Sequence, residues 1–234
     1  SIEQTFEGNV AFGNRVSATI SRNGDLVHKM YVEFKPNEFI STAATGAFLA
    51  PNVTHTLLKE IELEIGGQRI DKHYGHWLTV WNNLTDSNPY AQYGSIGDIN
   101  GTAPGNIAAA FTLYQSMTYN YSGRENNVST TLAPARATVP LQFWFCRNPG
   151  LALPLIALQY HEVKVNIEFD TRANIHNQTD GTTSISSTKL WVDYIYLDTD
   201  ERRRFAQVSH EYLIEQLQFT GIESAKTNQH RLNF

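Results

Sequence analysis

The sequence has a single cysteine, Cys146, among its 234 residues. One thiol cannot form an internal disulfide, which excludes the small secreted folds that disulfides hold together and favours a reducing compartment. Cys146 follows directly on Phe143, Trp144 and Phe145, so it lies in an apolar stretch. Free cysteines in such surroundings usually behave as small hydrophobic residues, and we therefore expect a buried, unreactive thiol rather than a nucleophile.

Charge is also scarce, and its balance does not suit nucleic acid. Only 18% of the residues are charged, and the formal net charge is −5. A protein that binds nucleic acid through its general surface needs a basic face, so no direct nucleic-acid partner is expected. No apolar run reaches the roughly 18–20 residues of a membrane span. No signal peptide is recognisable, and the chain begins Ser1-Ile2-Glu3 without a methionine, which suggests processing or a cropped segment.

Apolar residues, in contrast, are plentiful. They make up 41% of the sequence, and aromatic residues alone make up 12%. This composition supports a packed core and excludes a disordered chain, which would combine low hydrophobicity with high net charge. At about 100–200 residues per domain, the length allows one large domain or two small ones.

A hairpin is predicted near the start of the chain. Residues 16–20 alternate between apolar and polar side chains, and residues 26–34 place Leu26, Met30 and Phe34 on one face. Asn23-Gly24 lies between the two runs, and this dipeptide favours the positive φ angles of a tight hairpin turn. The pattern therefore predicts two paired strands.

Period-two alternation and short apolar runs predict most of the other elements as strands too. Residues 151–158 are apolar but contain Pro154, so neither a regular central strand nor a helix is expected there. The further predicted strands are residues 57–65, 139–147, 163–169, 190–197 and 212–219.

One helix is predicted from the spacing of Trp77, Val80, Trp81 and Leu84, which places all four on one face over about three turns. We expect Trp77 and Trp81 to lie in the core, with a subunit contact as the second interpretation.

Long polar stretches separate these elements. Residues 90–137 and 171–187 are rich in Gly, Ser, Thr and Asn and are interpreted as loops, with short strands or a helical turn near residues 107–114. Many strands with long loops and one short helix indicate an all-β fold, a jelly-roll β-sandwich.

Acidic and histidine clusters are the first candidates for chemistry. Glu60, Glu62 and Glu64 share one face of the strand predicted at residues 57–65 and could bind a cation, but a solvated sheet face explains them better. His73 and His76 lie near Asp71, yet a zinc site needs three or four converging donors. We therefore predict no metal site.

The remaining polar motifs are also interpreted as structural. Ser209-His210-Glu211 contains the residue types of a catalytic triad, but adjacent residues cannot adopt triad geometry by themselves. The run Arg202–Arg204 could bind phosphate groups. The favoured interpretation is that it pairs with acidic neighbours such as Asp198, Asp200 and Glu201, or forms a subunit contact. We predict no catalytic residue and no cofactor. Sequons for N-glycosylation, which we expect to be unmodified loop asparagines, start at Asn52, Asn83, Asn100, Asn120, Asn127 and Asn177.

Five segments, in this order along the chain, carry a family resemblance. They are residues 2–6 (IEQTF), 21–26 (SRNGDL), 65–71 (IGGQRID), 143–162 (FWFCRNPGLALPLIALQYHE) and 200–206 (DERRRFA). Their content and order resemble the major capsid proteins of nucleocytoplasmic large DNA viruses, in the branch of the algal viruses, iridoviruses and marseillevirus-like viruses. The stretch from Arg147 to Glu162 is the most specific part of the resemblance.

The resemblance implies a structural protein with two jelly rolls per subunit. Three subunits would form a trimeric, pseudo-hexagonal capsomer, and capsomers would tile an icosahedral shell. Residues 1–199 would be the first roll, lacking its first strand, and residues 200–234 the inter-roll linker and the start of the second roll. The implied partners are copies of the chain (a homotrimer), neighbouring capsomers and minor capsid proteins. The implied location is the virion capsid, assembled in the host cytoplasm.

Two other functions fit a β-sandwich. A carbohydrate-binding, lectin-like module would also be β-rich with Tyr- and Asn-bearing loops. A sandwich hydrolase would need paired carboxylates in a cleft, and the residue spacing indicates none. Composition alone leaves the lectin and the capsid protein comparable, and the long segment match decides for the capsid protein.

Overall fold

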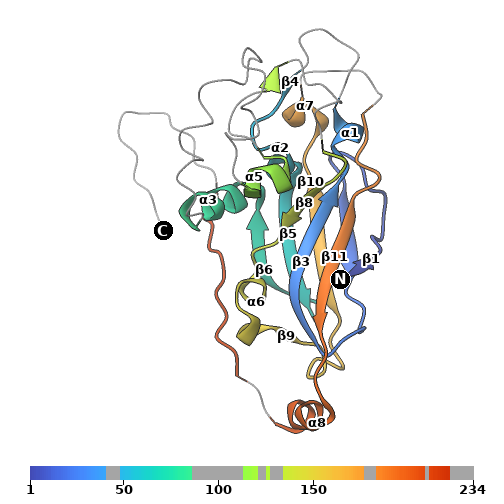
Figure 1. Ribbon diagram of the computed structural model, residues 1–234, viewed down its shortest axis with the longest axis vertical. Helices are drawn as coiled ribbons and strands as arrows, with labels where there is room; N and C mark the ends of the chain where they lie inside the picture. The colour runs from blue at the N-terminus through green and yellow to red at the C-terminus, as the bar shows by residue number, and fades with distance from the viewer. Residues whose placement is uncertain are drawn as a thin grey trace.

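The computed structural model describes residues 1–40, 48–85, 113–120, 125–126, 134–176, 183–208 and 211–221. Two antiparallel sheets lie face to face, and several of the helices gather at one end of them (Figure 1). The helix α8 lies at the opposite end, which we call the foot of the sandwich (Figure 1).

Each sheet has a path of four strands. The first sheet has the order β1 (Ile2–Gln4), β11 (Lys189–Ile195), β3 (Leu26–Phe34) and β8 (Ala137–Pro140), with the short β9 (Leu153–Pro154) also paired to β3. The second sheet has the order β2 (Arg15–Thr19), β10 (Val163–Phe169), β5 (Leu58–Ile65) and β6 (Gln68–Tyr74). All of these pairings are antiparallel.

The strand order is that of a jelly roll. Counting only the eight strands of the two four-strand paths, the first sheet holds the first, eighth, third and sixth in chain order, and the second holds the second, seventh, fourth and fifth. Neighbours are thus mostly distant in sequence, as two interleaved Greek keys require. The predicted jelly-roll β-sandwich is confirmed. A strand ahead of Ser1 concerns residues outside this chain and stays a prediction.

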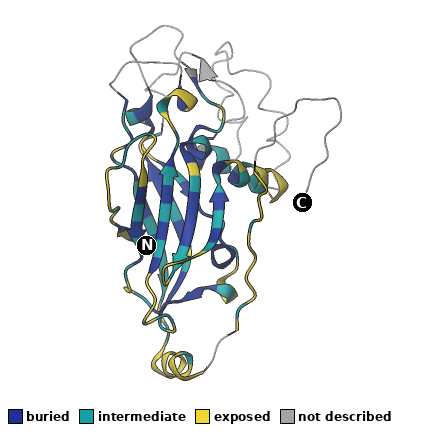
Figure 2. Cartoon of the chain, turned by 180° about the vertical axis from the view of Figure 1, so that it is seen from behind, coloured by how far each residue is buried: buried dark blue, intermediate teal, exposed yellow. Residues whose placement is uncertain are grey.

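The core fills the space between the sheets because every second strand residue points inward. In β10 the alternation is complete, with Val163, Val165, Ile167 and Phe169 buried. Phe169 meets Phe34 of the facing sheet edge to face, with ring centroids 6.4 Å apart. Burying one such side chain stabilises the fold by about 1.5–3 kcal/mol, so these alternating residues hold the layers together. Figure 2 shows the buried residues concentrated on the strands.

Short helices and one small sheet complete the fold. A two-stranded sheet pairs β4 (Phe48–Leu49) with β7 (Glu125–Asn126). The helices are α1 (Pro36–Phe39), α2 (Val53–Leu57), α3 (Gly75–Thr85), α5 (Leu113–Thr118), α6 (Trp144–Arg147), α7 (Arg172–Ile175) and α8 (Thr199–Gln207), with a 3₁₀ turn at Pro149–Leu151. The described residues therefore contain more helices than the one short helix that the sequence predicted.

The predicted hairpin between residues 16–20 and 26–34 is wrong, although both strands exist. β2 lies in the second sheet and β3 in the first, so residues 20–25 cross between the layers. Neither Asn23 nor Gly24 has the positive φ that a tight hairpin turn needs. Gly24 is required for another reason: a Cβ there would lie 2.6 Å from the Cβ of Tyr194.

The predicted strand at residues 139–147 is also wrong beyond its first two residues. β8 ends at Pro140, and residues 144–147 form the single helical turn α6. Trp144, Phe145 and Cys146 are all buried although they are consecutive. A short apolar run reports burial on all sides and cannot by itself separate a strand from a buried helical turn.

The last predicted strand is not formed. Residues 212–219 are extended but pair with no strand among the described residues. The irregular conformation predicted for residues 151–158 is confirmed, and so is the helix at Gly75–Thr85. Its buried residues are Gly75 and Leu78, whereas Trp77 and Trp81 are only half-buried. The loops predicted at residues 90–137 lie mostly outside the described residues.

Candidate functional site

The three aligned glutamates lie on the outer face of the second sheet, and each has a partner there. Lys72 Nζ lies 2.6 Å from Glu60 and 3.5 Å from Glu62, and Arg15 also pairs with Glu62. Glu64 accepts a hydrogen bond from the side-chain amide of Asn166 at 3.2 Å. Because cations from neighbouring strands pair with Glu60 and Glu62, and an amide bonds Glu64, the three carboxylates form a hydrogen-bonded and salt-bridged sheet face and not a cation site.

The two histidines of the second candidate do not converge. His73 is buried, its Nε2 lies 2.9 Å from Asp71 Oδ2, and its ring stacks on Phe143 with centroids 4.6 Å apart. His76, in contrast, is exposed on α3. Among the described residues, no group of three or more His, Cys, Asp or Glu side chains could hold a metal ion.

The arginine run pairs with an acid that the sequence did not indicate. The guanidinium of Arg202 donates to the carboxylate of Asp25, 177 residues earlier, and not to the carboxylates of its predicted neighbours Asp198, Asp200 or Glu201. Asp198 instead caps α8 by accepting a hydrogen bond from the backbone N–H of Glu201 at 2.8 Å. The other two arginines of the run are exposed.

Cys146 is buried as predicted. Burial raises the pKa of its thiol to about 12, so the reactive thiolate is not formed near neutral pH. Ser209 and His210, two of the three residues with the side-chain types of a catalytic triad, lie outside the described residues. The third, Glu211, is exposed.

The sequons fall in different environments. Asn120 is buried, and its Oδ1 accepts hydrogen bonds from the backbone N–H groups of Thr54 and His55 at 3.1 and 3.2 Å, so its side chain is not accessible to a glycan. Asn83 is exposed on α3 and not in a loop, and Asn52 precedes α2 with a left-handed backbone conformation. The three remaining sequons start outside the described residues.

Sequence reasoning missed a buried histidine at the helical end of the sandwich. His55 of α2 bonds Thr79 of α3 at 2.8 Å through Nδ1 and the hydroxyl of Tyr114 of α5 at 2.9 Å through Nε2. Burial lowers the pKa of His55 to about 4. A neutral imidazole therefore joins three helices, and no pattern of spacing in the sequence indicates such a contact.

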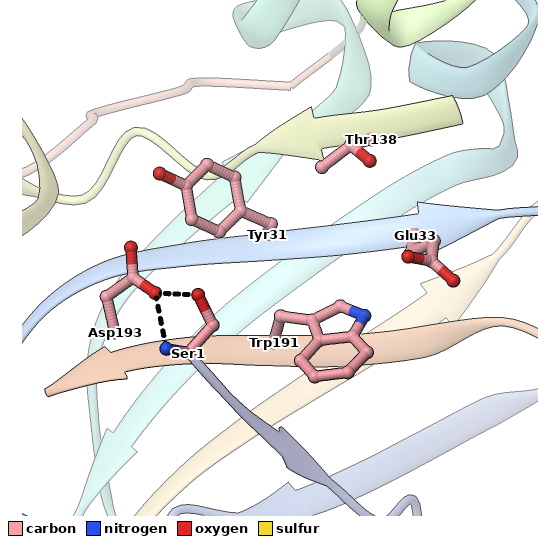
Figure 3. A pocket seen from close by; sticks show the side chains of 6 residues that line it. All are labelled: Ser1, Tyr31, Glu33, Thr138, Trp191 and Asp193. Atoms are coloured by element: carbon pink, nitrogen blue, oxygen red, sulfur yellow. Dashed lines mark hydrogen bonds and ion pairs between the residues drawn. The ribbon is translucent and has the colours of Figure 1, made fainter. Parts of the chain in front are cut away.

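A shallow depression of about 360 Å³ lies on the outer face of the first sheet (Figure 3). The rings of Tyr31 and Trp191 and the carboxylates of Glu33 and Asp193 project from neighbouring strands into this face (Figure 3). Burial, and after it the carboxylate of Asp193, raise the pKa of Tyr31. Arg136 lies 3.5 Å from Glu33. Aromatic rings with a polar rim are typical of protein contact surfaces.

No helix of the described residues is long and apolar enough to cross a lipid bilayer. Among the described residues, three surfaces have functional potential: a salt-bridged sheet face, an aromatic sheet face, and the extended residues 211–221 beside α3 (Figure 1).

Comparison with known proteins identifies relatives along the whole chain. Residues 1–198 match the family described as "Major capsid protein N-terminus". The chain is 50% identical over 244 residues to the major capsid protein of Pyramimonas orientalis virus, covering 100% of this chain and 52% of that protein. To the major capsid protein of Paramecium bursaria Chlorella virus 1 it is 43% identical over 232 residues, covering 96% of this chain and 46% of that protein.

The fold is likewise similar to that of a protein chain in a solved virus capsid. A chain of the quasi-atomic structure of the PBCV-1 virus capsid superposes with a TM-score of 0.64 at 37% identity, covering 100% of this chain and 52% of that chain. This chain thus spans about half the length of the curated relatives it matches.

Proposed function

This chain belongs to the family of the major capsid protein N-terminus, and from that membership we propose that it is the first of two jelly rolls in a subunit that builds the shell of a large DNA virus. The second roll would account for the half of the relatives' length that this chain does not span. Residues 1–199 would then be the first roll, and residues 200–234 the linker and the beginning of the second.

The observation that carries the proposal is the similarity of the whole sandwich to a chain of a virus capsid, at 37% identity and a TM-score of 0.64. The two chains are similar in sequence as well as in fold, and both similarities support a shared structural role.

The mechanism is assembly through surfaces. The outer face of the second sheet neutralises its own charges, as shown by the pairs of Glu62 with Arg15 and Lys72, and such a face is stable in water. The outer face of the first sheet exposes parts of Tyr31 and Trp191, residue types that are enriched in interfaces. We assign the first sheet's outer face to contacts between subunits in a trimer of six jelly rolls with a pseudo-hexagonal outline.

The partners and the location follow from the same proposal. Copies of the chain, neighbouring capsomers and minor capsid proteins would be the contacts, the virion would be the final location, and the host cytoplasm would be the site of assembly. Work of this kind requires no cofactor and no catalytic residue. The relatives lend no support to the lectin-like alternative, and we do not propose it.

Light scattering of the purified full-length protein tests the proposal. We expect a molar mass of three chains that persists on dilution. A stable monomer would contradict it, because a shell subunit of this kind has to bury its contact faces against copies of itself.

A further inference from the structure

Residues 211–221, which we call the strap, follow α8 and run from the foot of the sandwich past β6 to α3 (Figure 1). β6 is the edge strand of the second sheet, since among the described strands it pairs only with β5. The strap lies along this edge without forming a strand with it. Such an arrangement is typical of an anchored connection and not of an added strand.

Three alternate residues of the strap, 215, 217 and 219, contact the sandwich. The amide of Gln216 also donates to the backbone carbonyl of Ile70. The three alternating contacts are Glu215 Oε2 to Arg147 Nη2 at 2.7 Å, the backbone N–H of Leu217 to Asp71 Oδ1 at 3.2 Å, and the ring of Phe219 to that of Tyr74 with centroids 4.7 Å apart.

The partners of the strap are themselves fixed. Asp71 is buried and pairs with His73. The guanidinium of Arg147 lies over the ring of Trp81 on α3, 4.7 Å from its centroid, which is the range of a cation–π contact. At the foot, Arg202 is bonded to the buried Asp25. The connection that leaves the roll is therefore held at both ends.

Apolar side chains gather where the strap reaches α3. On α3, Leu84 is 75% exposed and Val80 41% exposed. On the strap, Phe219, whose ring contacts that of Tyr74 directly before α3, is 53% exposed. The strap is coloured mainly as exposed in Figure 2. Val80 and Leu84 belong to the predicted helix face, but the residues of α3 that the sandwich buries are Gly75 and Leu78. An apolar face left open by the described residues marks a contact site.

We propose that this face of α3 and the strap is covered by the C-terminal continuation of the full-length protein, which the strap holds in a fixed position beside β6. The inference rests on the proposed function, because it assigns the second roll as the occupant. The relatives are about twice as long as this chain, and the strap is the last described segment before that continuation. The described course of the strap ends beside this apolar face (Figure 1).

Photo-crosslinking in the full-length protein tests the occupant. Benzoylphenylalanine replaces Leu84 in one sample, and in a matched control it replaces Tyr160, which is 94% exposed and lies in the turn after β9. We expect position 84 to give a product with the mass of one chain, in which residue 84 is joined to a peptide beyond residue 234. Position 160 should not give that product.

Three results would overturn the inference: a product with the mass of two chains, a link to a residue within residues 1–234 of the same chain, or no link at position 84. Light scattering of the same samples reports assembly separately, so a trimer without the expected link contradicts only this inference, and a monomer contradicts the proposed function.

Hydrogen exchange tests the anchoring. In the full-length protein, the amides of the strap should exchange more slowly than those of a free peptide, and Arg147→Gln should remove much of that protection. The matched variant Arg203→Gln, at an exposed arginine of α8, should leave it unchanged. Strap amides that exchange as fast as a free peptide in the unmodified protein would refute a fixed strap.

Discussion

Arg202 donates two hydrogen bonds to the carboxylate of Asp25, from Nε to Oδ1 at 2.9 Å and from Nη2 to Oδ2 at 3.0 Å. Asp25 is buried and also accepts the backbone N–H of Leu197 at 2.8 Å. A two-point bond between a guanidinium and a carboxylate fixes orientation as well as distance. This pair therefore ties α8 to the connection between the two sheets.

Replacing Asp25 with alanine should destabilise the roll. The substitution removes the hydrogen bonds that this buried carboxylate accepts from the N–H of Leu197 and the guanidinium of Arg202, and hydrogen bonds to a charged group contribute about 1.5–3 kcal/mol. We expect a loss of this size in the free energy of unfolding of the full-length protein in urea. Arg203→Ala, at an exposed position on the same helix, is the matched control and should change stability by less than about 0.5 kcal/mol. Equal effects of the two variants would argue against the anchor.

Acid should weaken the helical end of the sandwich through His55. Burial lowers its pKa from 6.5 to about 4, so between these values the unfolded state binds a proton that the folded state does not. The stabilising contribution is complete above pH 6.5 and is lost as the pH falls toward 4. Between pH 7 and pH 5 the loss should be about 2 kcal/mol.

Urea unfolding at the two pH values measures this loss. His55→Gln should reduce the pH dependence by that amount, whereas His76→Gln, at an exposed position of α3, should not. A pH dependence that is the same in the unmodified protein and in His55→Gln would disprove the assignment.

Gly75 should tolerate no side chain. A Cβ at this position would lie 1.8 Å from the carbonyl oxygen of His55 and 2.6 Å from that of Leu58. Both are backbone atoms, so relief requires α3 to move away from α2. We expect Gly75→Ala to reduce the yield of soluble full-length protein sharply, with a stability loss of about 3 kcal/mol or more.

Gly150→Ala provides the comparison for Gly75→Ala. Its Cβ would meet the side chain of Asn148 at 3.3 Å, a contact that a small shift relieves. Its thermal unfolding midpoint should stay close to that of the unmodified protein. If both alanine variants behave alike, the close packing of α3 on α2 is wrong.

The strands were predictable because burial of one face leaves a period-two pattern. Residues 163–169 and 58–65 show it clearly, and both are strands of the second sheet. The pattern reports which face is buried but not which strand is the neighbour. Residues 16–20 and 26–34 therefore suggested a hairpin, although they lie in different layers.

The contacts that define the functional surfaces could not be predicted from the sequence, because they join distant residues. Asp25 meets Arg202, and Asp71 meets Leu217, across separations of 177 and 146 residues. The apolar spacing on α3 predicted a helix correctly. It could not reveal that Leu84 stays exposed in this roll, because an apolar stripe looks the same whether its partner lies within the chain or beyond it.

The central claim is tested most directly by an electron-microscopy reconstruction of the purified full-length protein. We predict a threefold particle with a pseudo-hexagonal outline, in which each subunit contributes two β-sandwiches and the sandwich described for this chain occupies three alternate positions of the six. A particle with one sandwich per subunit, or a population of single subunits without threefold symmetry, would contradict the account.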